Sequence, residues 1–217
     1  MRSSQFARLI LAVPALAAGL WAAAVFPDPP APTTGAPAAK KVTAVLAGGC
    51  FWGMEGVFEH VKGVLETQVG YAGGGKETAH YEMVGSGKTG HAESLKVTFD
   101  PTKVTYGQLL KIYFSVAHDP TTLNRQHYDV GTQYRSAIFY TDEEQKATAE
   151  AYIKQLNAAK VFHDAIVTQV VPLQAFYPAE DYHQHYLDLN PTQPYIVRMD
   201  LPLIEDLKKK YPEMYKK

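Results

Sequence analysis

Apolar and polar positions along residues 42–171 follow the repeats of strands and helices in turn. Five segments show the apolar runs or the strict alternation that predict strands, namely 42–47, 64–71, 92–99, 136–140 and 166–171. Between them, three segments have the helical repeat, namely 51–61, 105–117 and a segment from 141 to beyond 156. In the first helix, Phe51, Met54 and Phe58 share one face, which predicts that this face is buried.

Two of the predicted helices begin with capping-box sequences. Thr105 stands three positions before Gln108, and Thr141 stands three positions before Glu144. In such a pair each side chain bonds to a free backbone N–H of the other residue, which fixes where the helix begins. A short terminal helix is predicted at 203–211.

The order of the elements predicts an α+β fold, which is a two-layer α/β sandwich. The first six elements have the order of a ferredoxin-like split βαβ core with a mixed sheet. Residues 118–135 form a long polar segment, which is typical of a functional loop. After Pro172 the chain is rich in proline and aromatic residues and weakly periodic, so we expect a long irregular C-terminal segment.

The first residues have the features of a secretory leader. Arg2 and Arg8 precede or border an apolar stretch at 9–25, and Ala22-Ala23-Ala24 offers a cleavage site. We therefore interpret 1–26 as a signal peptide and expect an exported, periplasmic or secreted protein. The alternative is that 9–25 remains as a membrane anchor, because its length is near the lower limit for a spanning helix.

A Pro/Ala-rich linker at 27–40 separates the leader from one domain at 41–217. The composition of the chain, with 46% hydrophobic and 20% charged residues, is that of a globular protein. A formal net charge of −1 without a basic stripe excludes nucleic acid as an expected partner. We expect a monomer whose contact with a membrane is limited to an uncleaved N-terminal segment.

Cys50 is the only cysteine of the 217 residues. It lies where a predicted strand ends, Gly48 and Gly49 bend the chain, and a predicted helix begins. Free backbone N–H groups and the positive end of a helix dipole favour a thiolate at such a position. The aromatic pair Phe51-Trp52 beside it can form the wall of an apolar pocket. The alternative is that Cys50 is an unreactive core residue, as many free cysteines are.

Glu93 is the second candidate for chemistry. In the strand at 92–99 it shares a face with Leu95 and Val97, so the alternation places a carboxyl on the apolar side. Burial disfavours the charged form, so such a carboxyl keeps its proton near neutral pH and can act as a general acid. The alternative is a glutamate at a frayed strand end that turns toward solvent.

Six segments, in order along the chain, resemble the family of peptide methionine sulfoxide reductase A. They are 49–53, 70–74, 89–93, 118–126, 129–136 and 180–184. Segments of this kind in the family's order are highly specific, and the resemblance covers about residues 42–190.

The resemblance implies roles for four catalytic residues. Cys50 matches the nucleophile that attacks the sulfoxide sulfur, and Glu93 matches the acid that protonates the sulfoxide oxygen. Tyr81 and Tyr134 match the phenols that hydrogen-bond to that oxygen. The implied product is methionine, with a sulfenic acid left on Cys50.

The resemblance also implies how substrate is held. Phe51 and Trp52 match the pocket for the substrate methyl group, and Asp129 matches a residue that lines the site. The implied substrate is methionine S-sulfoxide, free or in oxidised proteins and peptides, and no bound cofactor is implied.

The chain departs from the family's pattern in two places. His127-Tyr128 stands where the family commonly has Gly-Asn, which adds bulk near the site. Many relatives have resolving cysteines near the C-terminus, and this chain has none. We therefore expect an external thiol to reduce Cys50, namely a thioredoxin-like protein, a glutaredoxin or a small thiol. We expect no metal site, because His183 and His185 lack the spacing of a zinc pair.

Two other classes of function stay open from the residues alone. One is a hydrolase or acyltransferase that uses Cys50 with a histidine as base. The other is a non-catalytic module that binds its ligand in an aromatic cage.

Overall fold

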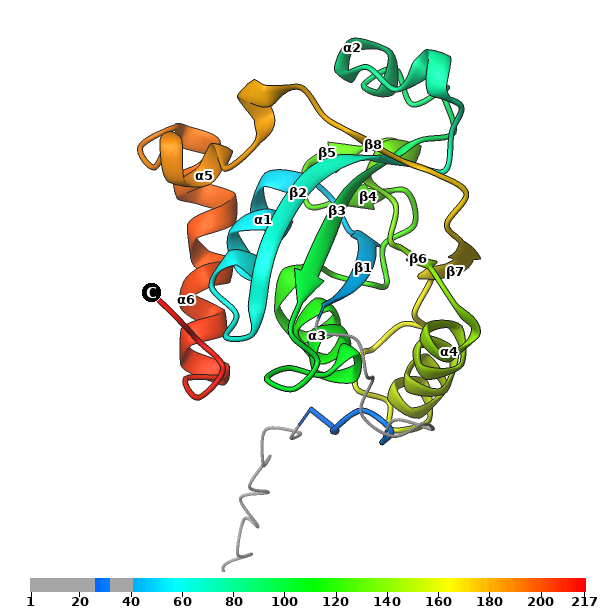
Figure 1. Ribbon diagram of the computed structural model, residues 1–217, viewed down its shortest axis with the longest axis vertical. Coiled ribbons are helices and arrows are strands. Elements are labelled where there is room, and N and C mark those ends of the chain that lie inside the picture. Colours follow the sequence, from blue (N-terminus) through cyan, green and yellow to red (C-terminus); the bar gives the residue numbers. More distant parts are fainter. Residues whose placement is uncertain (1–25, 32–40) are drawn as a thin grey trace, which may run out of the picture.

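The computed structural model describes residues 26–31 and 41–217, and within them the chain forms one six-stranded mixed sheet (Figure 1). The strands are β1 (Val42–Ala47), β2 (Val64–Ala72), β3 (Ala92–Phe99), β6 (Ala137–Tyr140), β7 (Gln169–Pro172) and β8 (Phe176–Pro178). Their spatial order is β7-β6-β1-β3-β2-β8, and the β6–β7 pair is parallel while the other pairs are antiparallel.

The four inner strands and the first two long helices confirm the predicted split βαβ core. The chain leaves β1 for α1 (Phe51–Glu59), returns through β2, and places β3 between them. It then passes through α3 (Tyr106–Ile112) to β6, on the other side of β1. This crossover puts the end of β1, and so Cys50, close to the middle of the sheet.

The capping-box prediction at the start of α3 is confirmed. Gln108 N donates to Thr105 Oγ1 at 3.1 Å, and Thr105 N donates to Gln108 Oε1 at 2.8 Å. The prediction at Thr141 is one residue early. Helix α4 (Glu143–Ala158) is capped by Asp142, whose Oδ1 accepts from Gln145 N at 2.8 Å.

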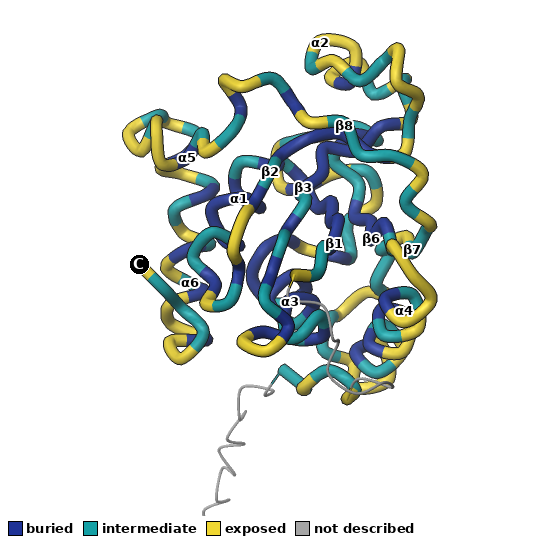
Figure 2. The backbone as a smooth tube through the Cα atoms, in the orientation of Figure 1, coloured by how far each residue is buried: buried dark blue, intermediate teal, exposed yellow. Residues whose placement is uncertain are grey.

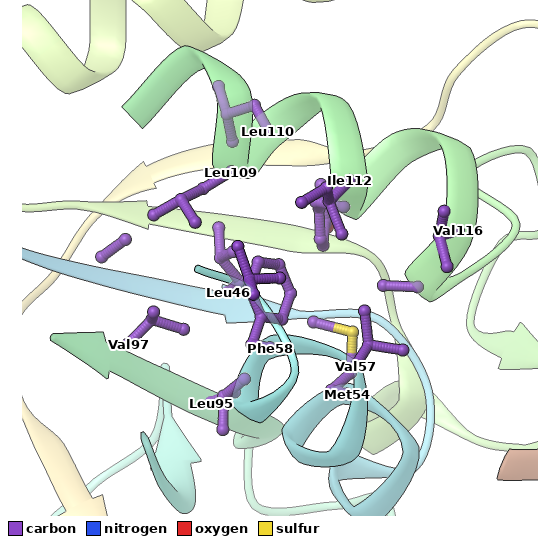
Figure 3. Close-up of a cluster of buried hydrophobic side chains, with 14 of the residues drawn as sticks. Leu46, Met54, Val57, Phe58, Leu95, Val97, Leu109, Leu110, Ile112 and Val116 are labelled. Atoms are coloured by element: carbon purple, nitrogen blue, oxygen red, sulfur yellow. The ribbon is translucent and has the colours of Figure 1, made fainter. Parts of the chain in front are cut away.

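The main core lies between one face of the sheet and the helices. Figure 2 shows that buried positions gather in the central strands and in the parts of the helices that face them. In the close-up of Figure 3, strand residues meet side chains from α1 and α3; the labelled ones include Leu46, Leu95, Val97, Met54, Val57, Phe58, Leu109 and Ile112. The opposite face has small side chains such as Ala47 and Ala92, and Leu173 and Phe176 cover it.

Several predicted boundaries shift where backbone groups find other partners. Strand β7 begins at Gln169 rather than 166, because Ile166 N donates to Asn157 Oδ1 and Val167 N donates to Pro120 O. Helix α1 ends two residues earlier than predicted, at Glu59. The terminal helix α6 (Leu201–Lys210) begins two residues earlier, with Pro202 in its first turn.

The segments between and after the predicted elements contain short helices and strands that the periodicity did not predict. Residues 73–90 include η1 (Lys76–Thr78) and α2 (Tyr81–Val84). Residues 118–135 include the hairpin of β4 (Arg125–Gln126) and β5 (Asp129–Val130), followed by η3 (Thr132–Tyr134). After Pro172 come β8, η4 (Asp181–His183), α5 (Tyr186–Leu189) and η5 (Ile196–Asp200).

The beginning of the predicted linker packs on the domain. Asp28 forms an ion pair with Lys111 at 2.6 Å, and Tyr152 Oη donates to Pro27 O at 2.7 Å. The predicted leader at 1–26 lies, except for Phe26, outside the described residues. Within the described ranges, no helix is long and apolar enough to cross a membrane.

Candidate active site

Cys50 lies at the N-cap of α1, directly after the turn that follows β1, as predicted. Its side chain is partly buried. Gly49 has φ +92°, and a Cβ there would stand 2.6 Å from Cγ of Gln126 in the β4–β5 hairpin. Glycine is therefore required both for the turn and for the close approach of the hairpin to the chain at Cys50.

Glu93 is buried beside Cys50, at 3% exposure. Its Oε2 accepts a hydrogen bond of 3.1 Å from the N–H of Phe51, the first residue of α1. Burial raises the pKa of Glu93 to about 8, and Asp129 adds to the shift while the bond from Phe51 opposes it. The carboxyl thus carries its proton at neutral pH, which is the state that a proton donor needs.

Two phenols lie close to this carboxyl and to the thiol. Tyr81 comes from the start of α2 and Tyr134 from the end of η3. Burial raises the pKa of Tyr81 to about 12, and the neighbouring Glu93 and Cys50 add to the shift. Burial, then Glu93 and Asp129, raise the pKa of Tyr134 as well. Both side chains are therefore neutral O–H donors.

The aromatic pair after Cys50 is held in place by the segment that follows β8. The ring of Trp52 stacks on Tyr186 at 3.9 Å between centroids, and its Nε1 donates to His183 Nδ1 at 3.2 Å. The ring of Phe51 is buried, 5.1 Å from His183. Because Trp52 remains partly exposed, the pair can form an apolar wall that a small ligand reaches.

Asp129, from β5, accepts a hydrogen bond from the phenol of Tyr195. Tyr195 also lies close to Cys50, and the periodicity gave no indication of its role. Asp200, at the end of η5, lies close to Cys50 as well. Both residues come from the weakly periodic C-terminal part of the chain. No pattern in the sequence there indicates that they lie beside Cys50.

Glu180 is a further residue that organises the site. Its two carboxylate oxygens accept from Tyr71 Oη at 2.7 Å and from Tyr81 N at 3.0 Å. It therefore ties the C-terminal segment to β2 and to the start of α2. The segment 180–184 was included in the family resemblance, but no role was predicted for this residue.

The helix end favours a thiolate at Cys50, as predicted, but other groups outweigh it, so the net pKa shift of the thiol is opposite to the one expected. Burial raises the pKa of the Cys50 thiol well above its usual range, and Glu93, Asp200 and Asp129 raise it further. The N–H of Trp52 bonds to the sulfur and lowers the pKa, but this contribution is smaller. Cys50 therefore carries its proton as a thiol at neutral pH.

The geometry does not favour a Cys–His hydrolase. Among the described residues, no histidine ring is hydrogen-bonded to Cys50; His183 accepts from Trp52, and His118 bonds to Ser136. Burial lowers the pKa of His118 to about 4 and keeps it neutral.

One group of side chains has the composition of a cation site. Ligand atoms of Glu55, Glu59 and His185 lie within 4.8 Å of one another. One oxygen of each carboxylate already has a partner, because His185 N donates to Glu55 Oε2 at 2.7 Å and the His185 ring pairs with Glu59 Oε1. Glu59 Oε2 has no hydrogen-bond partner among the described residues. The absence of a metal site stays a prediction.

A thiol beside a protonated carboxylic acid, two phenols and an aromatic pair is an arrangement that suits an oxidoreductase acting on sulfur. Comparison with known proteins agrees with this class. Residues 42–214 match the family model described as peptide methionine sulfoxide reductase, so the chain belongs to this family.

Curated relatives match over most of their length. The chain is 58% identical over 173 residues to "Peptide methionine sulfoxide reductase MsrA 2" of Mesorhizobium japonicum, covering 80% of this chain and 89% of the relative. It is 51% identical over 197 residues to the protein of the same name from Synechocystis sp., covering 88% and 91%.

Solved structures agree in fold. Reduced Mxr1 from Saccharomyces cerevisiae superimposes with a TM-score of 0.67 at 34% identity, covering 74% of this chain and 92% of that one. Methionine sulfoxide reductase A of Corynebacterium diphtheriae gives 0.63 at 37% identity, covering 74% and 80%. The chain is an oxidoreductase that acts on sulfur and reduces methionine sulfoxide.

Proposed function

We propose that the enzyme reduces the S epimer of methionine sulfoxide, free and in proteins, through a sulfenic acid on Cys50 that an external thiol reduces. The observation that carries this proposal is the buried carboxyl of Glu93, protonated at neutral pH and fixed by the N–H of Phe51 beside the nucleophile. A protonated acid next to a thiol is what a sulfoxide requires, because its oxygen must gain a proton while its sulfur is attacked.

Each functional side chain has one part in this scheme. The sulfur of Cys50 loses its proton and attacks the sulfoxide sulfur, while Glu93 gives its proton to the oxygen and Tyr81 and Tyr134 donate hydrogen bonds to it. The proton released by the thiol replaces the one that Glu93 gives up, so the carboxyl is neutral again after the step. The oxygen passes to Cys50, which becomes a sulfenic acid, and the substrate sulfur gains the electron pair that Cys50 loses. The wall of Phe51 and Trp52 holds the substrate methyl group, so only one epimer presents its oxygen to the acid.

Regeneration requires a partner because Cys50 is the only cysteine in the chain. An external thiol attacks the sulfenic sulfur and releases water, which leaves a mixed disulfide. A second thiol then releases Cys50 and forms a disulfide outside the enzyme. A thioredoxin-like protein, a glutaredoxin or a small thiol can each perform these steps, and no bound cofactor takes part.

One assay separates this function from the two alternatives. The enzyme is incubated with each epimer of N-acetyl-methionine sulfoxide and dithiothreitol, and N-acetyl-methionine is measured. We expect one epimer to be consumed, Cys50→Ser to abolish turnover, and Glu93→Gln to slow it moderately because the phenols remain. A hydrolase or a binding module would form no N-acetyl-methionine from either epimer.

The chemical intermediate has its own test. Without a reductant, we expect one methionine per enzyme and one added oxygen atom on Cys50, detected by mass spectrometry of the peptide that contains it. An unmodified Cys50 after methionine release would contradict the sulfenic acid.

We also propose that the protein is exported as a monomer after removal of residues 1–26. The charged start and apolar stretch of the leader support export. Mass spectrometry of the mature N-terminus tests cleavage, and an intact leader in a membrane fraction would instead support an anchor at 9–25. Gel filtration of the domain tests the monomer.

A further inference from the structure

Asp200 is a buried carboxyl that the proposed reaction does not use. It is 3% exposed, and its Oδ2 has no hydrogen-bond partner among the described residues. It stands at the N-cap of α6, where an aspartate commonly accepts a bond from the backbone of its own helix, yet its side chain makes no such bond. A buried polar atom without a hydrogen-bond partner lowers the stability of the fold, so its presence here calls for an explanation.

The side chain of Asp200 turns instead toward the helix that begins at Cys50. A Cβ added to Gly53 would stand 2.5 Å from Asp200 Oδ1, so the carboxyl lies against the first turn of α1. That turn lies at the positive end of the helix dipole, which stabilises a nearby negative charge, while its Phe51 and Trp52 N–H groups already bond to Glu93 and Cys50. The same end of α1 faces the sulfur of Cys50, its N-cap residue.

Two groups that can each carry a negative charge therefore lie at one helix end. We infer that Asp200 is a positioning residue for the nucleophile: its carboxylate competes with a Cys50 thiolate for the positive end of α1, so the ionised carboxylate keeps Cys50 protonated. The inference rests on the proposed role of Cys50 as the nucleophile. In this inference the C-terminal segment, which has no resolving cysteine, lowers the fraction of Cys50 that is ionised.

Other charges face this pair from each surrounding element. Glu93 of β3, Asp129 of β5 and three phenols lie close to Cys50, and all five groups remain when Asp200 is changed. The phenols are those of Tyr81, Tyr134 and Tyr195. Burial, with repulsion from Asp129, raises the pKa of Asp200 to about 7. The carboxyl is thus neutral below this pH and charged above it, so its effect on Cys50 must grow as the pH rises through about 7.

Alkylation of Cys50 by iodoacetamide measures the thiolate directly, because the chain has no other cysteine. In the full chain, we expect Asp200→Asn to increase the alkylation rate about tenfold at about pH 8.5, which is the order of effect that a nearby unit charge has in a poorly solvated site. At about pH 6 the rates of the two proteins should be nearly equal, since the side chain at position 200 is then mostly neutral in wild type and always neutral in the variant.

Three variants control the experiment. Asp200→Glu keeps the charge and should keep the slow rate, and Asp206→Asn on α6, where Asp206 pairs with Lys210, should change nothing. If Asp200→Asn fails to fold, Gly53→Ala serves instead, because its methyl group displaces the carboxyl and should also increase the rate above pH 7.

An increase of the same size at both pH values would mean that the substitution only opens the site, and would overturn the inference. Equal or slower alkylation at the higher pH would overturn it as well. Alkylation needs no sulfoxide, so a failure of the proposed reductase activity shows separately, as absence of methionine formation.

Discussion

Replacing Glu93 with glutamine should change how the stability of the protein depends on pH. On folding, burial raises the pKa of this carboxyl from 4.5 to about 8. An acid whose pKa is raised in the folded state stabilises the fold fully below its unfolded pKa, and this contribution is lost as the pH rises through the folded pKa. The group therefore makes wild-type protein less stable at about pH 7 than at about pH 5, by about 2.5 kcal/mol.

Glutamine has no proton to lose, and its side-chain oxygen can still accept from the N–H of Phe51. We therefore expect Glu93→Gln to gain about 2.5 kcal/mol relative to wild type between about pH 5 and about pH 7. Urea unfolding of both proteins at the two pH values measures the difference, and Glu150→Gln at an exposed position of α4 is the control. If the difference in the free energy of unfolding between Glu93→Gln and wild type is the same at both pH values, Glu93 is not a buried acid that keeps its proton.

Three further substitutions have expected effects on the free energy of unfolding, each measured by the same urea titration. Thr105→Ala removes the cap of α3 and should cost about 1 kcal/mol; no loss would contradict the capping box. His127→Gly should gain about 0.5 kcal/mol, because His127 has φ +51°, and a loss would contradict the strain. Tyr195→Phe removes the donor to Asp129 and should cost about 2 kcal/mol; an unchanged midpoint would argue against that bond.

The elements with long periodic patterns were predictable from sequence, and those held by distant partners were not. Strand β3 has both predicted ends, because its alternation reflects a sheet with one apolar face toward the helices. Strand β8 has three residues and no repeat, and it exists because its backbone pairs with β2. The conformation of so short a segment is set by the strand that it pairs with, and the sequence of the segment itself does not identify that strand.

The departure at His127-Tyr128 shows the same limit. The sequence suggested added bulk near the site, but Tyr128 is 82% exposed and points into solvent. His127 has the left-handed backbone that glycine adopts freely, so the hairpin keeps its turn although the residue has changed. The hairpin thus still delivers Asp129 to the site, with Gln126 against Gly49.

The state of Cys50 shows most clearly where local inference ends. Its place at a helix head was predictable, and a helix end alone favours a thiolate. Glu93, Asp129 and Asp200 come to it from positions 43, 79 and 150 residues further along the chain, and together with burial they reverse the sign of the pKa shift. Charges in a poorly solvated site act over several ångströms, so the ionisation of a buried thiol depends on the tertiary fold more than on its neighbours in sequence. It follows that relatives with the same residues around the cysteine can differ in resting thiol reactivity whenever their C-terminal segments place a different side chain against the first turn of α1.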